Sequence, residues 1–336
     1  MIATALDVDV DEDTMNETRS LAIARRLAVG AALGVAAAVP APVSAHGFAG
    51  ARFFPATIAT DDPFVADELS LPTVTWQKNP ADAPGVPAQR ETDYSLDAAR
   101  RITDRFGIEL GATWKTLRTP GTVDVRGLDN LSVGAKYQFF ESDAHEAIAS
   151  VGVDWDIGHS GARRVGADPF STATPALFFG KGLGDLPETM PWLRPIAVTG
   201  LVGVGIPSRA STSTRSDDGS VDVERHPHTL EWGLAFEYSI PYLNANVRAT
   251  GWPDVFARLT PVVELAMSTA LDRGSSGTTG TVNPGLLWDG RTVQIAAEAA
   301  IPVNRASGSY VGWTLQLHFF LDDLFPKTFG HPLVGS

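Results

Sequence analysis

The chain has 336 residues, 44% of them hydrophobic, and carries a formal net charge of −13 at pH 7. Its length allows one large domain or two ordinary ones. The absence of cysteine excludes disulfides and thiolate metal sites, and the acidic balance makes nucleic acid and anionic lipid poor partners, because a negative surface repels them.

The N-terminal region has the composition of a secretory signal peptide. A basic pair at residues 25–26 precedes an apolar run at residues 27–39, and small residues follow up to Ala45. We therefore predict that residues 1–45 are a signal peptide. Translation is expected to start at Met15, because the residues before it are acidic. The apolar run is too short for a retained transmembrane helix, which needs roughly 20 residues.

No later segment has about 18 consecutive apolar residues, so any membrane crossing has to use strands. Residues 46–66 form an apolar extension that carries Phe48, Phe53, Phe54 and Phe64. If the strands after it close into a barrel, this extension either enters the lumen as a plug or gate, or packs against the periplasmic rim. We favour the rim.

From about residue 67 to residue 325 the pattern has a period of two, which indicates β-strands. In one run Phe106 and Ile108 alternate with Gly107 and Glu109, so one face is apolar and the other is small or polar. Such runs lie at residues 69–77, 91–100, 105–116, 130–140, 147–157, 172–182, 193–206, 229–240, 258–269, 280–288, 292–302 and 310–321. A tilted strand crosses a bilayer in roughly 9 to 11 residues. The pattern predicts an all-β fold, a transmembrane antiparallel up-and-down β-barrel of about 12 strands.

The connections give a second test, because such barrels have short periplasmic turns and long external loops. Counted from the first strand, the odd connections are long and polar, and the even ones are mostly short. Residues 241–257 are the exception. A segment of that length holds a short helix or an extra strand pair.

Tryptophan placement gives a third test, because aromatic residues form belts at both interfaces of a membrane barrel. The tryptophans at the first or last positions of the predicted strands are Trp76, Trp114, Trp155, Trp192, Trp232, Trp288 and Trp313. A soluble β-protein would also alternate, with its apolar face turned inward. The terminal tryptophans, the loop asymmetry and the small or polar opposite face favour the membrane barrel.

The last two strands carry a family resemblance. The segments Glu298–Asn304 (EAAIPVN) and Gly312–Pro326 (GWTLQLHFFLDDLFP) resemble the C-terminal hairpin of outer-membrane channels named for the MetA pathway of phenol degradation. The resemblance covers roughly residues 67–325 in pattern and implies a transport channel. This chain departs from the commonest ending at an aromatic residue, because it continues as a tail over residues 326–336. The aromatic residues that could substitute as the signal for the barrel insertion machinery are Phe319, Phe320 and Phe325.

An outward apolar face would turn the alternate residues of each strand into the lumen. The candidates for lining a pore are Glu109, Lys115, Lys136, Gln138, Asp154, Asp156, Lys181, Glu231, Glu237, Glu264, Gln294, Glu298, Gln316 and His318, with Asp93 and Asp97 beside them. Acids outnumber bases, so an open lumen would prefer cations or uncharged polar solutes. Equally, these groups could pair across a filled interior and only stabilise it. Twelve strands lie between the roughly eight that side chains fill and the 16 to 18 that leave a water channel.

Covalent chemistry has little support in the sequence. His159 and Ser160 are neighbours in a predicted loop, and a hydrolase would need such a pair beside an acid. His226 and His228 lie near Glu224 at a spacing that could bind metal, but solvated histidines are the simpler interpretation. We expect no catalytic residue, no metal and no cofactor.

The sequence therefore predicts a channel for passive diffusion of small solutes through a mildly acidic lumen, exported to the outer membrane of a Gram-negative cell. Its expected partners are outer-membrane lipid, the barrel insertion machinery and small-molecule solutes, but no nucleic acid. Two alternatives stay open: an outer-membrane enzyme of the lipase or deacylase type, and a structural or adhesive barrel that acts through its extracellular loops, notably residues 207–227. The pattern does not decide whether barrels assemble into homo-oligomers.

Overall fold

The computed structural model describes residues 47–79, 87–215, 219–272 and 277–335. All of them belong to one compact unit, residues 45–336. The predicted signal peptide, residues 1–45, lies outside the described residues. None of the described helices is both long and apolar enough to span a membrane.

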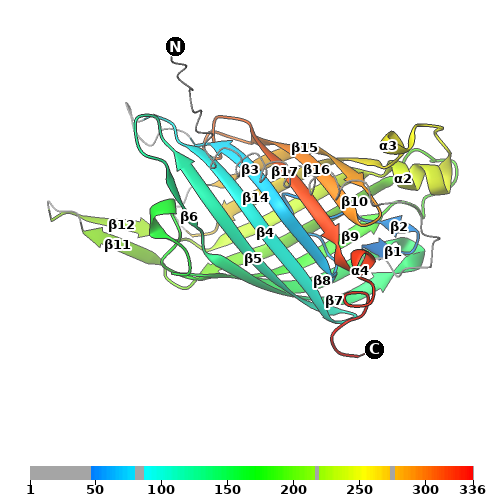
Figure 1. Ribbon diagram of the computed structural model, residues 1–336, viewed down its shortest axis with the longest axis horizontal. Helices are drawn as coiled ribbons and strands as arrows, with labels where there is room; N and C mark the ends of the chain where they lie inside the picture. The colour runs from blue at the N-terminus through cyan, green and yellow to red at the C-terminus, as the bar shows by residue number, and fades with distance from the viewer. Residues whose placement is uncertain (1–46, 80–86, 216–218, 273–276, 336) are drawn as a thin grey trace, which may run out of the picture. The chain divides into compact units, whose positions relative to one another are not determined.

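Twelve antiparallel strands form a closed barrel, in which each strand pairs with its neighbours along the chain (Figure 1). The barrel closes where the last strand pairs with the first, with Trp313 opposite Trp76 and Phe319 opposite Leu69. The barrel strands are β3 (Glu68–Lys78), β4 (Arg90–Thr103), β5 (Phe106–Arg118), β7 (Leu131–Ser142), β8 (Ala147–Ile157), β9 (Thr172–Gly182), β10 (Ile196–Pro207), β13 (Thr229–Tyr238), β14 (Leu259–Ala270), β15 (Thr278–Asp289), β16 (Val293–Pro302) and β17 (Gly312–Phe320). Each predicted run corresponds to one of these strands, so the predicted fold class is confirmed.

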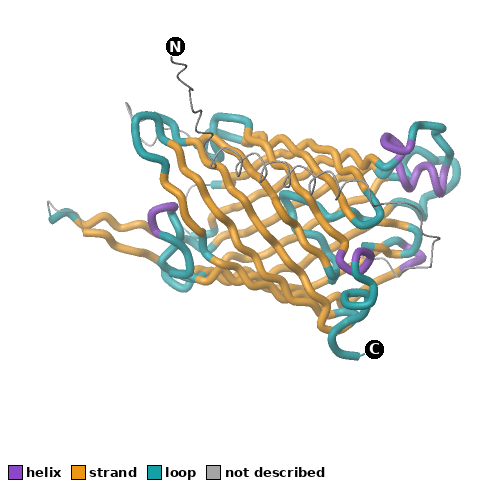
Figure 2. Tube along the Cα trace, viewed as in Figure 1, coloured by secondary structure: helices purple, strands orange, loops and turns teal. Residues whose placement is uncertain are grey.

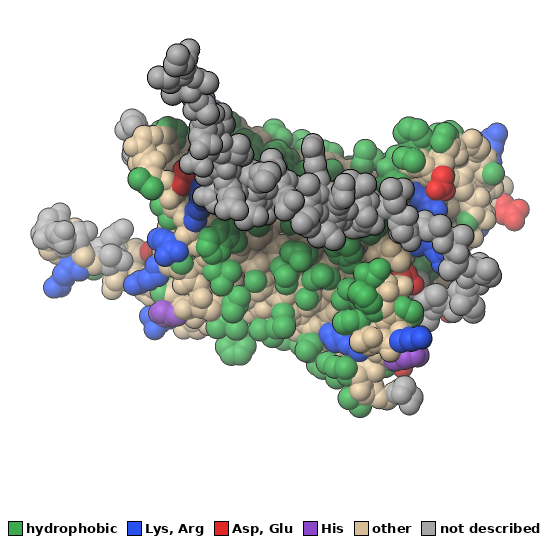
Figure 3. Space-filling view, in the orientation of Figure 1, with side chains coloured by type: hydrophobic (Ala, Val, Ile, Leu, Met, Phe, Trp, Pro, Cys, Tyr) green, Lys and Arg blue, Asp and Glu red, His purple; other side chains and the backbone are tan. Residues whose placement is uncertain are grey.

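The apolar face of the sheet points outward. Leu110 in β5 and Leu315 in β17 are 53% and 50% exposed, whereas Glu264 in β14 and Gln294 in β16 are completely buried. Hydrophobic side chains accordingly cover the wall between the two ends of the barrel, and most charged groups visible on this face lie near those ends (Figure 3). Because side chains alternate between faces along a strand, the period of two in the sequence sorts apolar groups outward and polar groups inward.

The two ends of the barrel differ (Figure 2). We call the end where β3 begins and β17 finishes the turn end, and the opposite one the loop end. The loop-end connections hold further structure: β6 (Val125–Leu128), which extends the sheet beside β5, the helical turn η2 (Arg163–Val165), and the separate hairpin of β11 (Ser211–Arg215) and β12 (Val221–Arg225).

The turn end has tight connections and two long ones. Residues 104–105 and 290–292 are short turns, and η1 (Asp143–His145) is a single helical turn. The connection from β13 to β14 contains helices rather than a strand pair: α2 (Ile240–Tyr242), the π-type turn η3 (Leu243–Val247) and α3 (Asp254–Ala257). Residues 183–195 form a second long connection, where a shorter one was expected, because β10 begins only at Ile196.

Most strand-borne tryptophans lie toward the loop end. The indoles of Trp76 and Trp313 stack there with their ring centroids 6.5 Å apart, and Trp288 lies near the turn end of β15. The prediction for Trp192 is wrong, because this residue belongs to the connection 183–195 and not to a strand; its side chain is 56% exposed.

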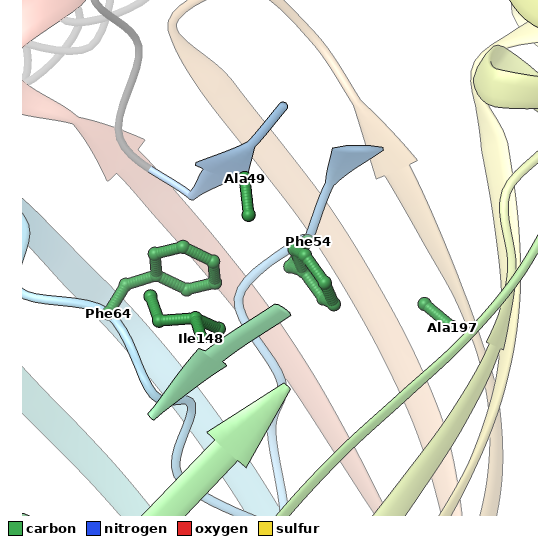
Figure 4. Close-up of a cluster of buried hydrophobic side chains, with 5 residues drawn as sticks. All are labelled: Ala49, Phe54, Phe64, Ile148 and Ala197. Atoms are coloured by element: carbon green, nitrogen blue, oxygen red, sulfur yellow. The ribbon is translucent and has the colours of Figure 1, made fainter. Parts of the chain in front are cut away.

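The segment ahead of β3 enters the barrel, so the preference for packing against the rim is wrong for residues 54–66, which contact inward side chains. A short hairpin of β1 (Phe48–Ala49) and β2 (Arg52–Phe53) lies at the turn end, beside α2 and α4 in Figure 1. Residues 54–66, which we call the interior segment, then contact inward side chains of the wall. Figure 4 shows Phe54 and Phe64, with ring centroids 5.4 Å apart, in a buried cluster with Ile148 of β8 and Ala197 of β10.

The chain after β17 stays at the turn end. Helix α4 (Leu321–Leu324) follows the last strand directly. The predicted tail then binds the end of β4, where Leu333 N donates to Arg101 O at 3.3 Å and Val334 N donates to Ile102 O at 2.8 Å. The segments at the two ends of the barrel unit, residues 47–53 and 321–334, therefore both lie at the turn end.

Because the outer face is apolar, the effect of a charged substitution on the unfolding free energy should depend strongly on its position along the wall. Leu110→Arg places a charge near the middle of β5, and we expect it to lower the unfolding free energy in a bilayer by about 2–4 kcal/mol, the cost of an arginine at the midplane of such a barrel. Guanidinium titration of protein refolded in phosphatidylcholine vesicles measures this loss. Leu271→Arg, at an exposed position after β14, is the matched control, with a change within about 0.5 kcal/mol. Equal losses in both variants would contradict the orientation of the sheet.

Candidate functional site

Nearly all residues predicted to line the lumen point inward. Direct partners on adjacent strands share a face, so the inward face can be followed around the barrel from Glu264, which contacts the interior segment. This register places inward Glu109, Lys115, Lys136, Gln138, Asp154, Asp156, Glu231, Glu237, Gln294, Glu298, Gln316 and His318, together with Asp93 and Asp97. Contact between these residues and a solute stays a prediction.

Lys181 is the exception, and its assignment to the lumen is wrong. Its neighbours Phe178 and Gly180 in β9 pair with Ser150 and Ile148 of β8, and Phe178 is 1% exposed against the interior. Lys181 therefore has the outward parity. Its ammonium instead donates to Asp185 Oδ2 at 3.0 Å and to backbone carbonyls at the turn end.

Glu264 anchors the interior segment at mid-barrel. Its carboxylate accepts backbone hydrogen bonds from Ile58 at 2.8 Å, Ala59 at 3.0 Å and Thr60 at 2.7 Å, and a fourth from the hydroxyl of Thr60 at 2.7 Å. Glu264 is completely buried. Successive backbone N–H groups that converge on one oxyanion form an anion-binding concavity, so here the wall supplies the anion and the segment supplies the concavity.

Lys136 binds the segment from the opposite part of the wall. Its ammonium donates to Asp61 Oδ1 at 2.9 Å and to Asp62 O at 2.7 Å, and it lies 4.7 Å from the ring centroid of Phe178. Burial, helped by the nearby carboxyl of Glu68 and opposed by Lys136, raises the pKa of Asp62 to about 7. Residues 58–62 of the segment are thus bound by an acidic wall residue, Glu264, and by a basic one, Lys136.

Two more backbone carbonyls of the segment also accept hydrogen bonds from the wall. Gln294 Nε2 donates to Ala56 O at 2.7 Å, and the hydroxyl of Ser150 donates to Pro63 O. Irregular backbone at membrane depth requires such partners, because lipid and a dry interior offer none. The segment is therefore a hydrogen-bonded part of the folded barrel.

Glycines on the inward face make room for this segment. A methyl carbon added at Gly233 in β13 would lie 2.5 Å from Thr60 Cγ2, and one at Gly107 in β5 would lie 2.8 Å from Val65 Cγ1. Both distances are far below van der Waals contact. Gly233 and Gly107 thus mark two places where the segment approaches the wall.

A buried charge cluster holds the entry hairpin. Arg52 is completely buried and donates to Glu146 Oε2 at 3.2 Å and to Pro195 O at 3.0 Å. Its guanidinium lies 3.6 Å from the ring centroid of Tyr242, whose hydroxyl donates to Glu146 Oε1 at 2.8 Å. Burial lowers the pKa of Arg52, and Glu146 opposes this shift. The two long turn-end connections therefore fasten the hairpin.

A second ion-pair cluster fixes the exit of the segment into β3. Asp67 is completely buried and accepts from Arg100 Nη1 and from Arg101 Nε, each at 2.7 Å. Arg101 N donates to the same carboxylate at 2.8 Å. The interior segment is thus bound at its entry, its turn and its exit.

Several of the predicted lumen residues, Lys115 and His318 among them, pair with nearby wall groups. Lys115 lies 2.7 Å from Asp129 Oδ2 and 3.6 Å from Glu91 Oε1. His318 Nδ1 is 2.9 Å from Ser70 Oγ, and its Nε2 is 3.3 Å from Glu68 Oε2. Some inward charges therefore stabilise the interior, as one of the two interpretations of the sequence held.

A cavity remains between the interior segment and the wall. It has a volume of about 260 Å³ and is bounded by residues 56–62 on one side and by β3, β4, β5 and β17 on the other. Its polar lining comprises Thr57, Thr60, Asp61, Asp62, Glu68, Ser70, Asp97, Glu109, Gln316 and His318. The predicted residues that reach this cavity are therefore Glu109, Gln316 and His318, beside Asp97.

The candidate catalytic and metal residues are engaged in other contacts. The Ser160 hydroxyl donates to Ile157 O at 2.5 Å and accepts from Leu131 N at 2.8 Å. His226 Nε2 is 2.9 Å from Thr212 Oγ1, and His228 Nδ1 is 3.5 Å from Asp272 Oδ1. Within the described ranges no group of three or more His, Asp or Glu side chains is placed to hold a metal ion.

The residues that sequence reasoning missed are those that bind the segment. Arg52, Asp61 and Asp67 lie in or beside an otherwise apolar extension, and Ser150 is one of many small residues on the inward face. The signal that could have found the first three is charge, because ionised groups inside an apolar stretch need buried partners.

No known family model matches the chain, and no curated protein matches its sequence. Solved structures match its fold. An outer-membrane channel from Pseudomonas putida F1 is 12% identical over 79% of this chain and 99% of that one, with a TM-score of 0.50. The KdgM porin is 11% identical over 74% and 98%, with a TM-score of 0.40, and LpxR from Salmonella typhimurium is 12% identical over 75% and 99%, with a TM-score of 0.38. The likeness to the Pseudomonas channel supports the outer-membrane barrel architecture, and the family named for the MetA pathway stays a prediction.

The Glu264 anchor can be tested by amide exchange. Glu264→Gln keeps the shape but turns one acceptor oxygen into a donor that faces backbone N–H groups, so at least one buried group loses its partner. We expect the free energy of local opening at residues 58–60 to fall by about 2–3 kcal/mol. Hydrogen–deuterium exchange followed by mass spectrometry measures this change.

Glu231→Gln is the matched control for this variant. Glu231 also faces inward but bonds to Ser268 of the neighbouring strand, at 2.8 Å. Its replacement should leave exchange at residues 58–60 unchanged. Unaltered exchange in the Glu264 variant would refute the anchor.

Proposed function

We propose that the protein is an outer-membrane channel through which small solutes diffuse passively, along a path that the interior segment narrows. The observation that carries the proposal is the closed barrel with an apolar outer face and a charged inner face. A barrel of 12 strands encloses more room than side chains alone fill. The interior segment occupies part of that room and leaves a polar cavity of about 260 Å³ beside it.

The charges of the interior give the path its selectivity. Among the inward residues of the described strands, carboxyl groups outnumber lysines, and Asp154, Asp156 and Glu231 lie in the halves of β8 and β13 that are nearer the loop end. A lumen with this lining favours cations and uncharged polar solutes over anions.

Two likenesses support transport. The Pseudomonas putida neighbour is an outer-membrane channel. The C-terminal hairpin of this chain resembles the channel family named for the MetA pathway of phenol degradation. In this proposal residues 1–45 direct export and are removed, and the insertion machinery reads the last strand, β17, with its aromatic end.

One observation favours a second candidate, a barrel that binds a partner through its loops. The hairpin of β11 and β12 at the loop end is paired only with itself among the described strands, and it exposes Val221 and Val223 by 51% and 55%. Exposed apolar side chains on a projecting hairpin are a contact surface. Conduction separates the two candidates.

Deleting the interior segment tests the channel directly. In planar bilayers we expect small conductance steps for the wild-type protein and several-fold larger steps for the protein without residues 47–66, because the deletion opens the lumen. The β-sheet content from circular dichroism shows whether the deleted protein still folds. A folded wild-type and a folded deletion protein that both fail to conduct would overturn the proposal in favour of the loop-binding candidate.

Neutralising carboxyl groups in the loop-end half of the barrel tests the charge effect. Combined Asp154→Asn, Asp156→Asn and Glu231→Gln substitutions should move the reversal potential in a potassium chloride gradient toward zero, because they remove negative charge from the path. Asp254→Asn, in the exposed helix α3, removes a charge outside the barrel and should change nothing. An unchanged reversal potential in the triple variant would contradict a charge-selective lumen.

A further inference from the structure

The cavity beside the interior segment contains more acidic groups than its basic neighbours can neutralise. Asp61 and Asp62 line it from the segment, while Glu68, Asp97 and Glu109 line it from β3, β4 and β5. Lys136 is the amine that pairs with this group, through Asp61 at 2.9 Å. Buried carboxylates are costly unless cations or hydrogen-bond donors compensate for them.

The donors of the surrounding protein are mostly used elsewhere. Asp62 accepts from Phe64 N at 2.9 Å, and Glu68 lies 3.3 Å from His318 Nε2. Asp97 and Glu109 accept no hydrogen bond from any residue in the described part of the chain. Two carboxyl groups on the wall thus face the cavity without a protein donor.

The side-chain amide of Gln316, in the same cavity, is a further acceptor without a donor in the described part of the chain. Gln316 lines the cavity and is 9% exposed, and its amide nitrogen donates to Thr73 Oγ1 at 3.3 Å. Its Oε1 has no hydrogen-bond partner among the described residues. Buried amide oxygens in folded proteins usually accept a hydrogen bond, so this oxygen keeps capacity to accept one from a bound solute.

We propose that this cavity is a binding site for a small organic cation that carries ammonium groups. An ammonium has three donors and no acceptor, which complements a cavity lined by carboxyl groups and by Gln316, whose amide oxygen is unpaired among the described residues. The site deepens the proposed channel function, on which it rests for the passage of such a solute, by naming the class of solute that pauses beside the interior segment.

The size and shape of the site favour an organic cation over a metal ion. A volume of about 260 Å³ is many times the roughly 10–15 Å³ that one water molecule requires, so the site has room for a small organic molecule. Within the described residues, no set of three or more acidic or histidine side chains converges closely enough to hold a metal ion. Acidic groups line both the segment and the wall, so a diamine can bind one side with each ammonium.

Calorimetry with three four-carbon probes tests the site. The mature chain in detergent is titrated with 1,4-diaminobutane, 1,4-butanediol and succinate at about 0.15 M salt, which screens exposed charges. The probes share a length and differ in charge. We expect saturable binding of the diamine and no binding of the diol or of succinate.

Variants locate the binding. Asp97→Asn combined with Glu109→Gln should weaken diamine binding by roughly tenfold or more, because the two substitutions remove two charge-assisted hydrogen bonds to the ammonium groups. Glu188→Gln removes one charge from the exposed connection 183–195 and should bind like the wild type. Heat-modifiable migration in gels shows that each variant is folded. The amides preserve side-chain size, and Gln316→Met provides a second variant that removes the free acceptor without changing charge.

Two results would overturn the site: equal heats for the diamine and the diol, or wild-type affinity in both the double variant and Gln316→Met. Bilayer conductance without diamine reports on the channel separately. A conducting protein that binds no diamine refutes only the cation site, whereas a diamine-binding protein that does not conduct supports the site and refutes the channel.

Discussion

The hydrogen-bonded closure of β17 onto β3 is the constraint on which the structure depends. A membrane offers no water to strand edges, so a sheet that spans it has to pair its first strand with its last. Here β3 pairs with β17 on one side and with β4 on the other. Closure also gives the sheet two separate faces. The apolar outer face meets lipid, and the polar inner face meets only the interior of the barrel.

The interior segment follows from that separation. Twelve strands enclose a space that the inward side chains of this chain do not fill, since several of them are glycine or alanine. Filling it with irregular backbone introduces N–H and C=O groups that need partners. Glu264 receives the N–H groups, and Gln294, Ser150 and Lys136 donate to the carbonyls. The polar wall and the polar backbone therefore satisfy each other.

The same polarity governs the functional proposals. The wall carries more carboxyl groups than the segment can pair with its amides and than Lys136 can neutralise. The surplus lies on the cavity and toward the loop end, where the two proposals have solutes compensate it. A channel with acidic lining and a site for ammonium groups are two consequences of one imbalance, one along the path and one beside the segment.

Local pattern was enough to predict the strands. Side chains alternate every residue along any strand, so a run such as residues 105–116 is recognisable without its partners, and each predicted run became a barrel strand. The same alternation identified most inward residues, including Glu109 and Glu264. The alternation is weak in β9, which has no clear apolar face. The prediction therefore placed Lys181 inward, although Phe178 and Gly180 are the residues of β9 that face the interior.

What the amino-acid order settled by itself was therefore the set of strands, their two faces and the need for closure. Only the folded barrel decided that residues 54–66 bind inside it, that Arg52 and Asp67 fasten their ends, and that residues 183–195 form a long connection. The reason is the distance in sequence between the residues that interact. Alternation is a property of neighbouring residues, whereas the contact of Ile58 with Glu264 joins groups that lie together only after the sheet has closed around them.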